Sequence, residues 1–217
     1  MILADCHVHS AFSDDCETPV EQMIETAIAQ GKKYFYLTDH QDFDYPVMDD
    51  GVTFQLAQEP YVRRMEELKY QYKDKIDIRI GVELGLMAHI KDKTEAYAKA
   101  YDYDFIIGSS HMVNGVDPYY PAYYADKNEY QAYEQYFLSI LDNVKAYDCY
   151  HVYGHLDYIM RYVPNQTKPY DPMAYGDIFR EILKTIIDHG KGIEVNTGSL
   201  YKGFDFPHPH AAILKLY

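Results

Sequence analysis

The sequence of 217 residues contains no tryptophan and only three cysteines. The odd number of cysteines and the lack of C-x-x-C spacing among Cys6, Cys16 and Cys149 argue against a disulfide scaffold. Long hydrophobic runs are also missing. Only residues 1–4 are apolar before Asp5, so no signal peptide is predicted, and no later stretch is apolar over the length of a bilayer. We therefore expect a cytoplasmic protein that does not enter a membrane.

Basic residues are scarce as well, with 20 Lys and Arg against 34 Asp and Glu, which gives a formal net charge of −14. Such a surface repels phosphate backbones, so binding to nucleic acids or anionic membranes is disfavoured. The acidic excess is either a solvated surface or, in part, carboxylates that bind metal ions. The length and a hydrophobic content of 47% fit one soluble domain, at most two. The 25 tyrosines can line a polar pocket or cap the edge of a core.

Apolar runs alternate with helical patterns along the chain, which is typical of an α/β protein. The first helix should cover about residues 19–30, because Thr18-Pro19-Val20-Glu21 has the form of a capping box and Gly31 can end a helix. Later helices are predicted near residues 61–73, 93–101, 128–146 and 173–189. Polar loops are predicted at residues 41–60 and 112–127.

Each of the six predicted strands ends at a side chain that can bind a metal ion. These side chains are His9, His40, Glu83, His111, His155 and Glu194. In βα barrels, the carboxyl ends of the strands meet at the working face of the molecule. His7 joins His9 there, because alternate residues of an extended segment lie on one face. Imidazole nitrogens and carboxylate oxygens suit zinc, iron and manganese, so the pattern predicts a metal site.

Each of these residues, taken alone, could be an ordinary polar residue that binds no metal. The ordered set of motifs, however, resembles the polymerase and histidinol phosphatase (PHP) family. The motifs are Asp5-x-His7-x-His9, Asp15, Thr38-Asp39-His40, Gly81-Val82-Glu83, Ser110-His111 and Gly154-His155-Leu156-Asp157. The bacterial histidinol-phosphatase branch is the most similar. The resemblance implies an α/β fold, a distorted (βα)7 TIM-like barrel of the PHP type, with two or three divalent metal ions (Zn, Fe or Mn) at its mouth.

The same resemblance assigns metal ligands to positions of this sequence. It implies His7, His9 and Glu83 at one ion, Glu83, His111 and His155 at a second, and Asp15 and His40 at a third. Asp5, Asp39 and Asp157 would orient the imidazoles by accepting their remaining N–H groups.

A protein of this kind is a metal-dependent phosphomonoesterase, and the resemblance implies a small phosphorylated substrate, L-histidinol phosphate. The candidate catalytic residues are Glu83, His111 and His155, which the resemblance implies, and Arg161, which lies six residues after His155 in a predicted loop. Arg161 has a guanidinium that matches phosphate geometry, although a surface salt bridge is its alternative role. Asp42 or Asp117, in the two predicted loops, would bind the cationic amino alcohol. Two other functions stay open, namely hydrolysis of nucleotides or oligonucleotide ends, and a metal-binding form with impaired catalysis.

The C-terminal part departs from the family pattern. Members carry a seventh strand that ends in an Asp-x-His motif, whereas this sequence stops at Tyr217 within an amphipathic run at residues 211–217. We therefore expect residues 1–217 to form a single PHP domain that is C-terminally incomplete and lacks its seventh strand. His208 and His210 alternate with prolines, which favours the rigid start of a helix over a metal-binding pair.

Overall fold

The computed structural model describes residues 2–47, 51–164 and 169–217. Residues 48–50 of the predicted loop at 41–60 lie outside the described residues. The chain folds into two compact units, of which the first comprises Met1–Gly85 and Ala96–Ile107 and the second Leu86–Glu95 and Gly108–Tyr217. None of the helices in the described ranges combines the length and the apolar character that crossing a bilayer requires.

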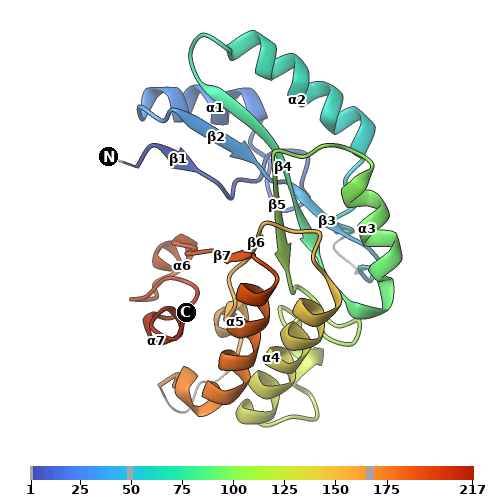
Figure 1. The fold of residues 1–217 in the computed structure, drawn as a ribbon, viewed down its shortest axis with the longest axis vertical. Coiled ribbons are helices and arrows are strands. Elements are labelled where there is room, and N and C mark those ends of the chain that lie inside the picture. The colour runs from blue at the N-terminus through green and yellow to red at the C-terminus, as the bar shows by residue number, and fades with distance from the viewer. Residues whose placement is uncertain (1, 48–50, 165–168) are drawn as a thin grey trace. The chain divides into compact units, whose positions relative to one another are not determined.

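Parallel strands form the centre of the first unit (Figure 1). They are β1 (Ala4–Asp5), β2 (Tyr34–Leu37), β3 (His40–Asp42) and β4 (Asp77–Gly85). β1 pairs with β2, and both β2 and β3 pair with β4. β2 pairs with the first part of β4 and β3 pairs with its last part. The single strand predicted to end at His40 is therefore two strands. In this register His40 is the partner of Glu83, which brings two predicted metal ligands side by side.

Two helices belong wholly to the first unit. α1 covers Val20–Ala29 and α2 covers Gln58–Tyr72. The capping box predicted at Thr18 is wrong, because α1 has Pro19 at its N-cap and no side chain caps it. The backbone carbonyl of Thr18 instead accepts the N–H of Ala11 at 3.0 Å, which ties Thr18 to the preceding loop. The C-terminal end agrees with the prediction, since Gly31 follows with a positive φ of 73°.

A buried tyrosine joins α2 to the strands of the first unit. The hydroxyl of Tyr61 lies 3.0 Å from the carbonyl oxygen of Leu37 and 2.9 Å from that of Gly81, and the side chain is fully buried. Gly81 is required at its position, because a Cβ there would lie 2.7 Å from the carbonyl oxygen of Phe105. These contacts fix the strand ends from which the predicted ligands emerge.

Two long helices and a short parallel pair of strands build the second unit. The strands are β6 (Val152–Tyr153) and β7 (Gly192–Ile193), and β5 (Phe105–Ser109) begins in the first unit and ends in the second. The helices α4 (Glu129–Ala146) and α5 (Gly176–Asp188) lie side by side, with the rings of Phe137 and Phe179 at 4.5 Å (Figure 1). The shorter helices are α3 (Lys91–Lys99, shared between the units), α6 (Gly198–Tyr201) and α7 (Ala211–Leu214), with 3-10 turns at Ala88–Ile90, Pro121–Tyr124, Tyr158–Arg161 and Pro172–Tyr175.

Tyrosines of the second unit are core residues that hold backbone carbonyls. Tyr136 donates to the carbonyl of Ser110 at 2.9 Å, and Tyr147 donates to that of Met87 at 2.7 Å. Both side chains are almost completely buried. A buried phenol needs a hydrogen-bond partner. Here the partners are the carbonyl of Ser110, just after β5, and that of Met87, just before the 3-10 turn at Ala88–Ile90.

The start of α7 agrees with the expectation for the His-Pro repeat. His210 is the N-cap of α7, and its Nδ1 accepts the N–H of Ala212 at 3.1 Å. His208 is fully buried and takes a different role, which is described with the site.

Candidate metal centre

Two histidines and one carboxylate converge in the first unit. The Nε2 atoms of His7 and His9 lie 3.1 Å apart, and each lies 3.1 Å from Oε2 of Glu83. Glu83 is completely buried. The two histidines follow β1 in an irregular segment rather than lying in a strand, since β1 ends at Asp5. The side-by-side placement that alternation predicted is nevertheless present.

A second group shares His9 and adds Asp15 and His40. The Nδ1 of His9 lies 2.9 Å from Oδ2 of Asp15, and Nε2 of His40 lies 3.7 Å from the same oxygen. The Nδ1 of His40 also lies 3.3 Å from Oε2 of Glu83, so the two groups are joined through both Glu83 and His9. Burial alone would raise the pKa of Asp15, but hydrogen bonds and charge from His40 and His9 outweigh it and hold that pKa below its usual value.

Loop contacts fix the direction of these histidines. Val8, between His7 and His9, forms two hydrogen bonds with Thr38. The Val8 N–H donates to the Thr38 hydroxyl at 3.0 Å, and the Thr38 N–H donates to the Val8 carbonyl at 2.9 Å. The backbone N–H of His40 donates to the hydroxyl of Ser13 at 2.8 Å. The segment after β1 and the segment between β2 and β3 are thus tied together.

Asp39 was predicted to orient an imidazole, and the structure gives it another role. Its fully buried carboxylate accepts the backbone N–H of Ser10 at 2.7 Å and the hydroxyls of Ser10 and Ser13 at 3.0–3.1 Å. Burial raises the pKa of Asp39 although these donors favour its ionised form. Asp39 therefore shapes the loop that leads to Asp15. Asp5, the second predicted acid, is exposed at the end of β1.

Asp42 is a further acid that contacts the imidazole of His40. Its Oδ2 lies 3.1 Å from Nδ1 of His40, and its side chain is completely buried. Gly85 makes this arrangement possible, because a Cβ at Gly85 would lie 1.9 Å from Oδ1 of Asp42. Asp42 is among the predicted contacts of the substrate, and in the structure it is a partner of His40.

In the second unit, His111 follows a firmly held residue. The hydroxyl of Ser110 lies 2.6 Å from the hydroxyl of Tyr153 and accepts the side-chain N–H of Asn143 at 2.9 Å. The carbonyl of Ser110 accepts the hydroxyl of Tyr136. Two residues of α4 and one of β6 therefore set the path of the chain as it reaches the buried His111.

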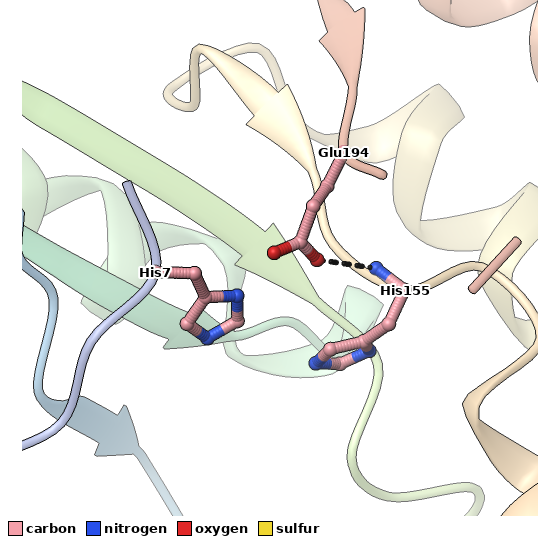
Figure 2. A group of neighbouring side chains, drawn as sticks. All are labelled: His7, His155 and Glu194. Carbon is pink, nitrogen blue, oxygen red and sulfur yellow. Dashed lines mark hydrogen bonds between the residues drawn. The ribbon is translucent and has the colours of Figure 1, made fainter. Parts of the chain in front are cut away.

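His155 lies beside His111, with ring centroids at 5.5 Å. Its backbone N–H donates to Oε2 of Glu194 at 2.9 Å, the bond marked by the dashed line in Figure 2. Oε1 of Glu194 accepts the side-chain N–H of Asn196 at 3.1 Å. Glu194, which the strand pattern included among potential ligands, therefore anchors the backbone at His155.

Arg161 contacts the ring of Tyr158, which also lies beside His155 and His111. The ring of Tyr158 is 4.9 Å from that of His155 and 5.8 Å from that of His111, and the guanidinium of Arg161 lies over its face at 5.1 Å. An Nη2 of Arg161 donates to Oδ1 of Asn196 at 3.4 Å. Among the described residues, the contacts of Arg161 are thus an aromatic face and an amide, and no salt bridge is seen there.

Asp157, the third acid predicted to orient an imidazole, does so for a histidine outside the predicted ligands. Its Oδ1 lies 2.7 Å from Nδ1 of His208, and its Oδ2 accepts the backbone N–H of His210 at 2.8 Å. Asp157 and His208 are both completely buried. This pair connects the segment after β6 to the start of α7.

The donor set of the first unit fits a divalent cation. His7, His9 and Glu83 place one ligand atom each within 4.8 Å of one another, and so do His9, Asp15 and His40. Imidazole nitrogen together with carboxylate oxygen is the mixture that zinc, iron(II) and manganese(II) accept. A buried carboxylate among three imidazoles is also well placed to bridge two such ions.

Sequence reasoning missed Tyr158 and the roles of Ser110 and Asp42. Tyr158 lies three residues before Arg161 on one 3-10 turn, and that spacing alone would have placed the two side chains on one face. The contacts of Ser110 with α4 depend on tertiary packing and have no local signal.

Comparison with known proteins identifies the class to which this fold and site belong. The PHP domain family matches residues 5–198, and the chain belongs to this family. The histidinol-phosphatase of Lactococcus lactis is 34% identical over 194 residues, which are 89% of this chain and 71% of that protein. A probable histidinol-phosphatase of Clostridium acetobutylicum is 30% identical over 198 residues, which are 91% of this chain and 74% of that protein.

Solved structures agree with this assignment. The crystal structure of histidinol phosphate phosphatase from Lactococcus lactis, complexed with zinc, L-histidinol and phosphate, superposes with a TM-score of 0.83 at 33% identity and covers 89% of this chain and 73% of that one. The putative histidinol phosphatase of Listeria monocytogenes gives a TM-score of 0.80 at 21% identity, over 98% and 89% of the two chains, and shows the fold alone. The predicted α/β, TIM-like fold of the PHP type is confirmed.

Proposed function

We propose that this protein is a histidinol-phosphatase, which hydrolyses L-histidinol phosphate to L-histidinol and phosphate. The observation that carries the proposal is the imidazole and carboxylate cluster around the buried Glu83, in a chain 34% identical to a histidinol-phosphatase. The net charge of −14 disfavours long nucleic acids as substrates.

The cluster of the first unit would hold divalent cations. His7, His9, Asp15, His40 and Glu83 are the proposed ligands, and the family resemblance adds His111 and His155 of the second unit. Bound cations would supply Lewis acidity to water and to the phosphoryl oxygens. The buried Glu83 keeps the imidazoles converged, and Asp42 fixes the tautomer of His40 by accepting its Nδ1–H. We predict two or three such cations, with zinc, iron and manganese as the expected metals.

Arg161 is the proposed phosphate-binding residue. Its guanidinium offers paired N–H donors that match two phosphoryl oxygens. Tyr158 supports it from one side and Asn196 accepts one of its N–H groups, so the side chain is already oriented before a phosphate arrives. Such orientation lowers the entropy that binding would otherwise cost.

Asp117 is the proposed partner of the substrate's ammonium group. Its side chain is buried in the loop after β5, where Oδ1 accepts the backbone N–H of Tyr119 at 2.7 Å. A buried carboxylate beside aromatic residues suits an organic cation, because charge and ring faces both favour it.

A substrate panel tests the function. The purified chain, reconstituted separately with zinc and manganese, would be assayed on L-histidinol phosphate, mononucleotides and short oligonucleotides by phosphate release. We expect turnover of L-histidinol phosphate that exceeds the others and is absent in Glu83→Gln. A preference for nucleotides would replace this substrate, and bound metal without turnover of any ester would instead indicate a catalytically impaired metal-binding form.

We further infer that residues 1–217 act as one PHP domain and that the reaction takes place in the cytoplasm. The three cysteines support the second point, because none of them forms a disulfide within the described part of the chain.

A further inference from the structure

A short loop segment covers the imidazole of His40. We call residues 53–56 the strap. One edge of the strap is held by Asp14, whose Oδ2 accepts the backbone N–H of Thr53 at 2.7 Å and that of Phe54 at 2.8 Å. The hydroxyl of Thr53 lies 3.3 Å from the same oxygen.

The other edge of the strap is attached to β3. The N–H of Asp42 donates to the carbonyl of Phe54 at 2.8 Å, and the side-chain N–H of Gln55 donates to the carbonyl of Asp42 at 2.9 Å. The N–H of Leu56 donates to Oε1 of Gln41 at 2.9 Å. The strap is thus fixed on both sides by residues next to proposed ligands, since Asp14 precedes Asp15 and Gln41 follows His40.

Phe54 adopts a backbone conformation that bulky residues rarely take. Its φ is 48°, in the left-handed region where a side chain with a Cβ is strained. The strained conformation directs the ring of Phe54 onto His40, with ring centroids at 4.7 Å, and onto Tyr45 at 4.9 Å. Strain of this kind persists only where the surrounding contacts determine it, and here the hydrogen bonds to Asp14 and Asp42 do so.

We propose that the strap positions His40 for the metal centre, with Asp14 holding Phe54 against the face of the imidazole. His40 is then restrained on three sides, by Asp42 at Nδ1, by Asp15 at Nε2 and by Phe54 on the ring face. Phe54 also keeps water from that face, which strengthens the electrostatic contacts of the histidine. Asp14 and Phe54 are positioning residues, and this role depends on the proposed metal centre.

Metal retention is the first test. Asp14→Ala, Phe54→Ala and the milder Phe54→Leu would be compared with the wild-type chain loaded with zinc, and bound zinc would be measured by elemental analysis along a titration with a chelator. We expect Asp14→Ala and Phe54→Ala to release zinc at chelator concentrations about 10-fold lower, since outer contacts of a metal ligand typically change affinity by about 10- to 100-fold. Asp74→Asn, at an exposed acid of the same unit, serves as the control and should behave as wild type.

The second test needs no metal. In chelator-stripped protein, the ring current of Phe54 should shift the carbon-bound ring protons of His40 in NMR spectra, and Asp14→Ala should move those resonances toward their free values. The amides of Thr53 and Phe54 should also exchange faster with solvent in Asp14→Ala.

The two tests separate this inference from the proposed function. Unchanged zinc retention in Asp14→Ala and both Phe54 variants, or unchanged His40 resonances in Asp14→Ala, would overturn the role of the strap while leaving the phosphatase intact. If the wild-type chain binds neither zinc nor manganese, the proposal of a metal centre is refuted. The role proposed for the strap is then refuted as well, even if the NMR shift confirms that Phe54 contacts His40. If Phe54→Ala does not fold, Phe54→Leu provides the comparison, with a smaller loss expected.

Discussion

The Nε2 atoms of His7 and His9 lie 3.1 Å apart, the distance of a hydrogen bond, and both face the same oxygen of Glu83. Two imidazole lone pairs cannot face each other at this distance, so either one nitrogen carries a proton or a cation binds both. The buried negative charge of Glu83 favours a cation at this point. A divalent cation bound by both Nε2 atoms would therefore satisfy the two imidazoles and Glu83 together.

The first prediction concerns Glu83. Glu83→Gln keeps the shape of the side chain but removes its charge, so metal content should fall to a small fraction of the wild-type value. Phosphatase activity should fall by more than about 100-fold, because this residue is a proposed ligand and outer contacts alone typically contribute about 10- to 100-fold. Elemental analysis and phosphate release would be measured on the same preparation, with Glu17→Gln, an exposed acid, as control. Full activity in Glu83→Gln would refute the metal centre.

Arg161 gives the second prediction. Arg161→Ala should lower kcat/KM for L-histidinol phosphate by about 10- to 100-fold, because hydrogen bonds to charged groups contribute about 1.5–3 kcal/mol. Arg161→Lys should recover only part of this loss, since an ammonium keeps the charge but lacks the planar pair of donors. Steady-state kinetics on the metal-loaded chain would measure both. Equal kcat/KM in all three proteins would show that Arg161 does not contact the phosphate.

The third prediction concerns the buried pair of Asp157 and His208. Removing one partner of a buried hydrogen bond to a carboxylate typically costs about 1.5–3 kcal/mol, because the other partner is left without its counterpart. His208→Ala should therefore lower the free energy of unfolding by about 1.5–3 kcal/mol in urea titrations. In a double-mutant cycle, Asp157→Asn combined with His208→Ala should cost less than the sum of the single changes. Additive losses would mean that the contact contributes nothing of its own.

Gly85 gives the fourth prediction. A Cβ at this position would lie 1.9 Å from Oδ1 of Asp42, so Gly85→Ala must displace Asp42 from His40. Overpacking of this kind costs about 1–3 kcal/mol, and zinc retention should weaken as well. Asp42→Ala removes the clash, and Gly85→Ala in that background should cost clearly less stability, as urea titrations would show. The same cost in both backgrounds would contradict the clash.

The fifth prediction concerns acid stability through Asp104. Burial would raise the pKa of Asp104, but the N–H of Ile80 at 2.9 Å and the ammonium of Lys69 at 3.1 Å outweigh this and lower it from the ordinary value of 3.8. A lowered pKa in the folded state contributes stability that is fully present above the unfolded value and is lost as the pH falls through the folded value. Asp104→Asn should therefore cost about 1–2 kcal/mol at pH 7 and progressively less below pH 4. A loss independent of pH would contradict this.

The residues of the proposed metal centre could be selected from the sequence because each follows or interrupts an apolar run. The predicted strand ends were less accurate, since β3 begins at His40 and β4 continues past Glu83 to Gly85. Element type was also predictable where the pattern was long, as for α4, predicted at 128–146 and observed at Glu129–Ala146.

Roles that depend on contacts between distant segments could not be predicted. Asp39 and Asp157 were expected at predicted ligands, but Asp39 holds serines of a neighbouring loop and Asp157 holds His208, which lies 51 positions away. The capping box at Thr18 failed for a related reason, since a loop contact of its backbone competes with the local motif. Composition and spacing describe which side chains are available, whereas tertiary contacts decide which partner each one meets.

Asp14 and Asp15 are neighbours in the chain with carboxylates that serve different partners, one the strap and the other two imidazoles. Their order therefore matters as much as their chemistry. Losing one residue between Ser10 and Asp14 would bring Asp15 to the place of Asp14, and gaining one would bring Asp14 to the place of Asp15, so one set of partners would lose its carboxylate in either case. We therefore expect a change in the length of this stretch to be tolerated less well than substitution of the exposed Ala11.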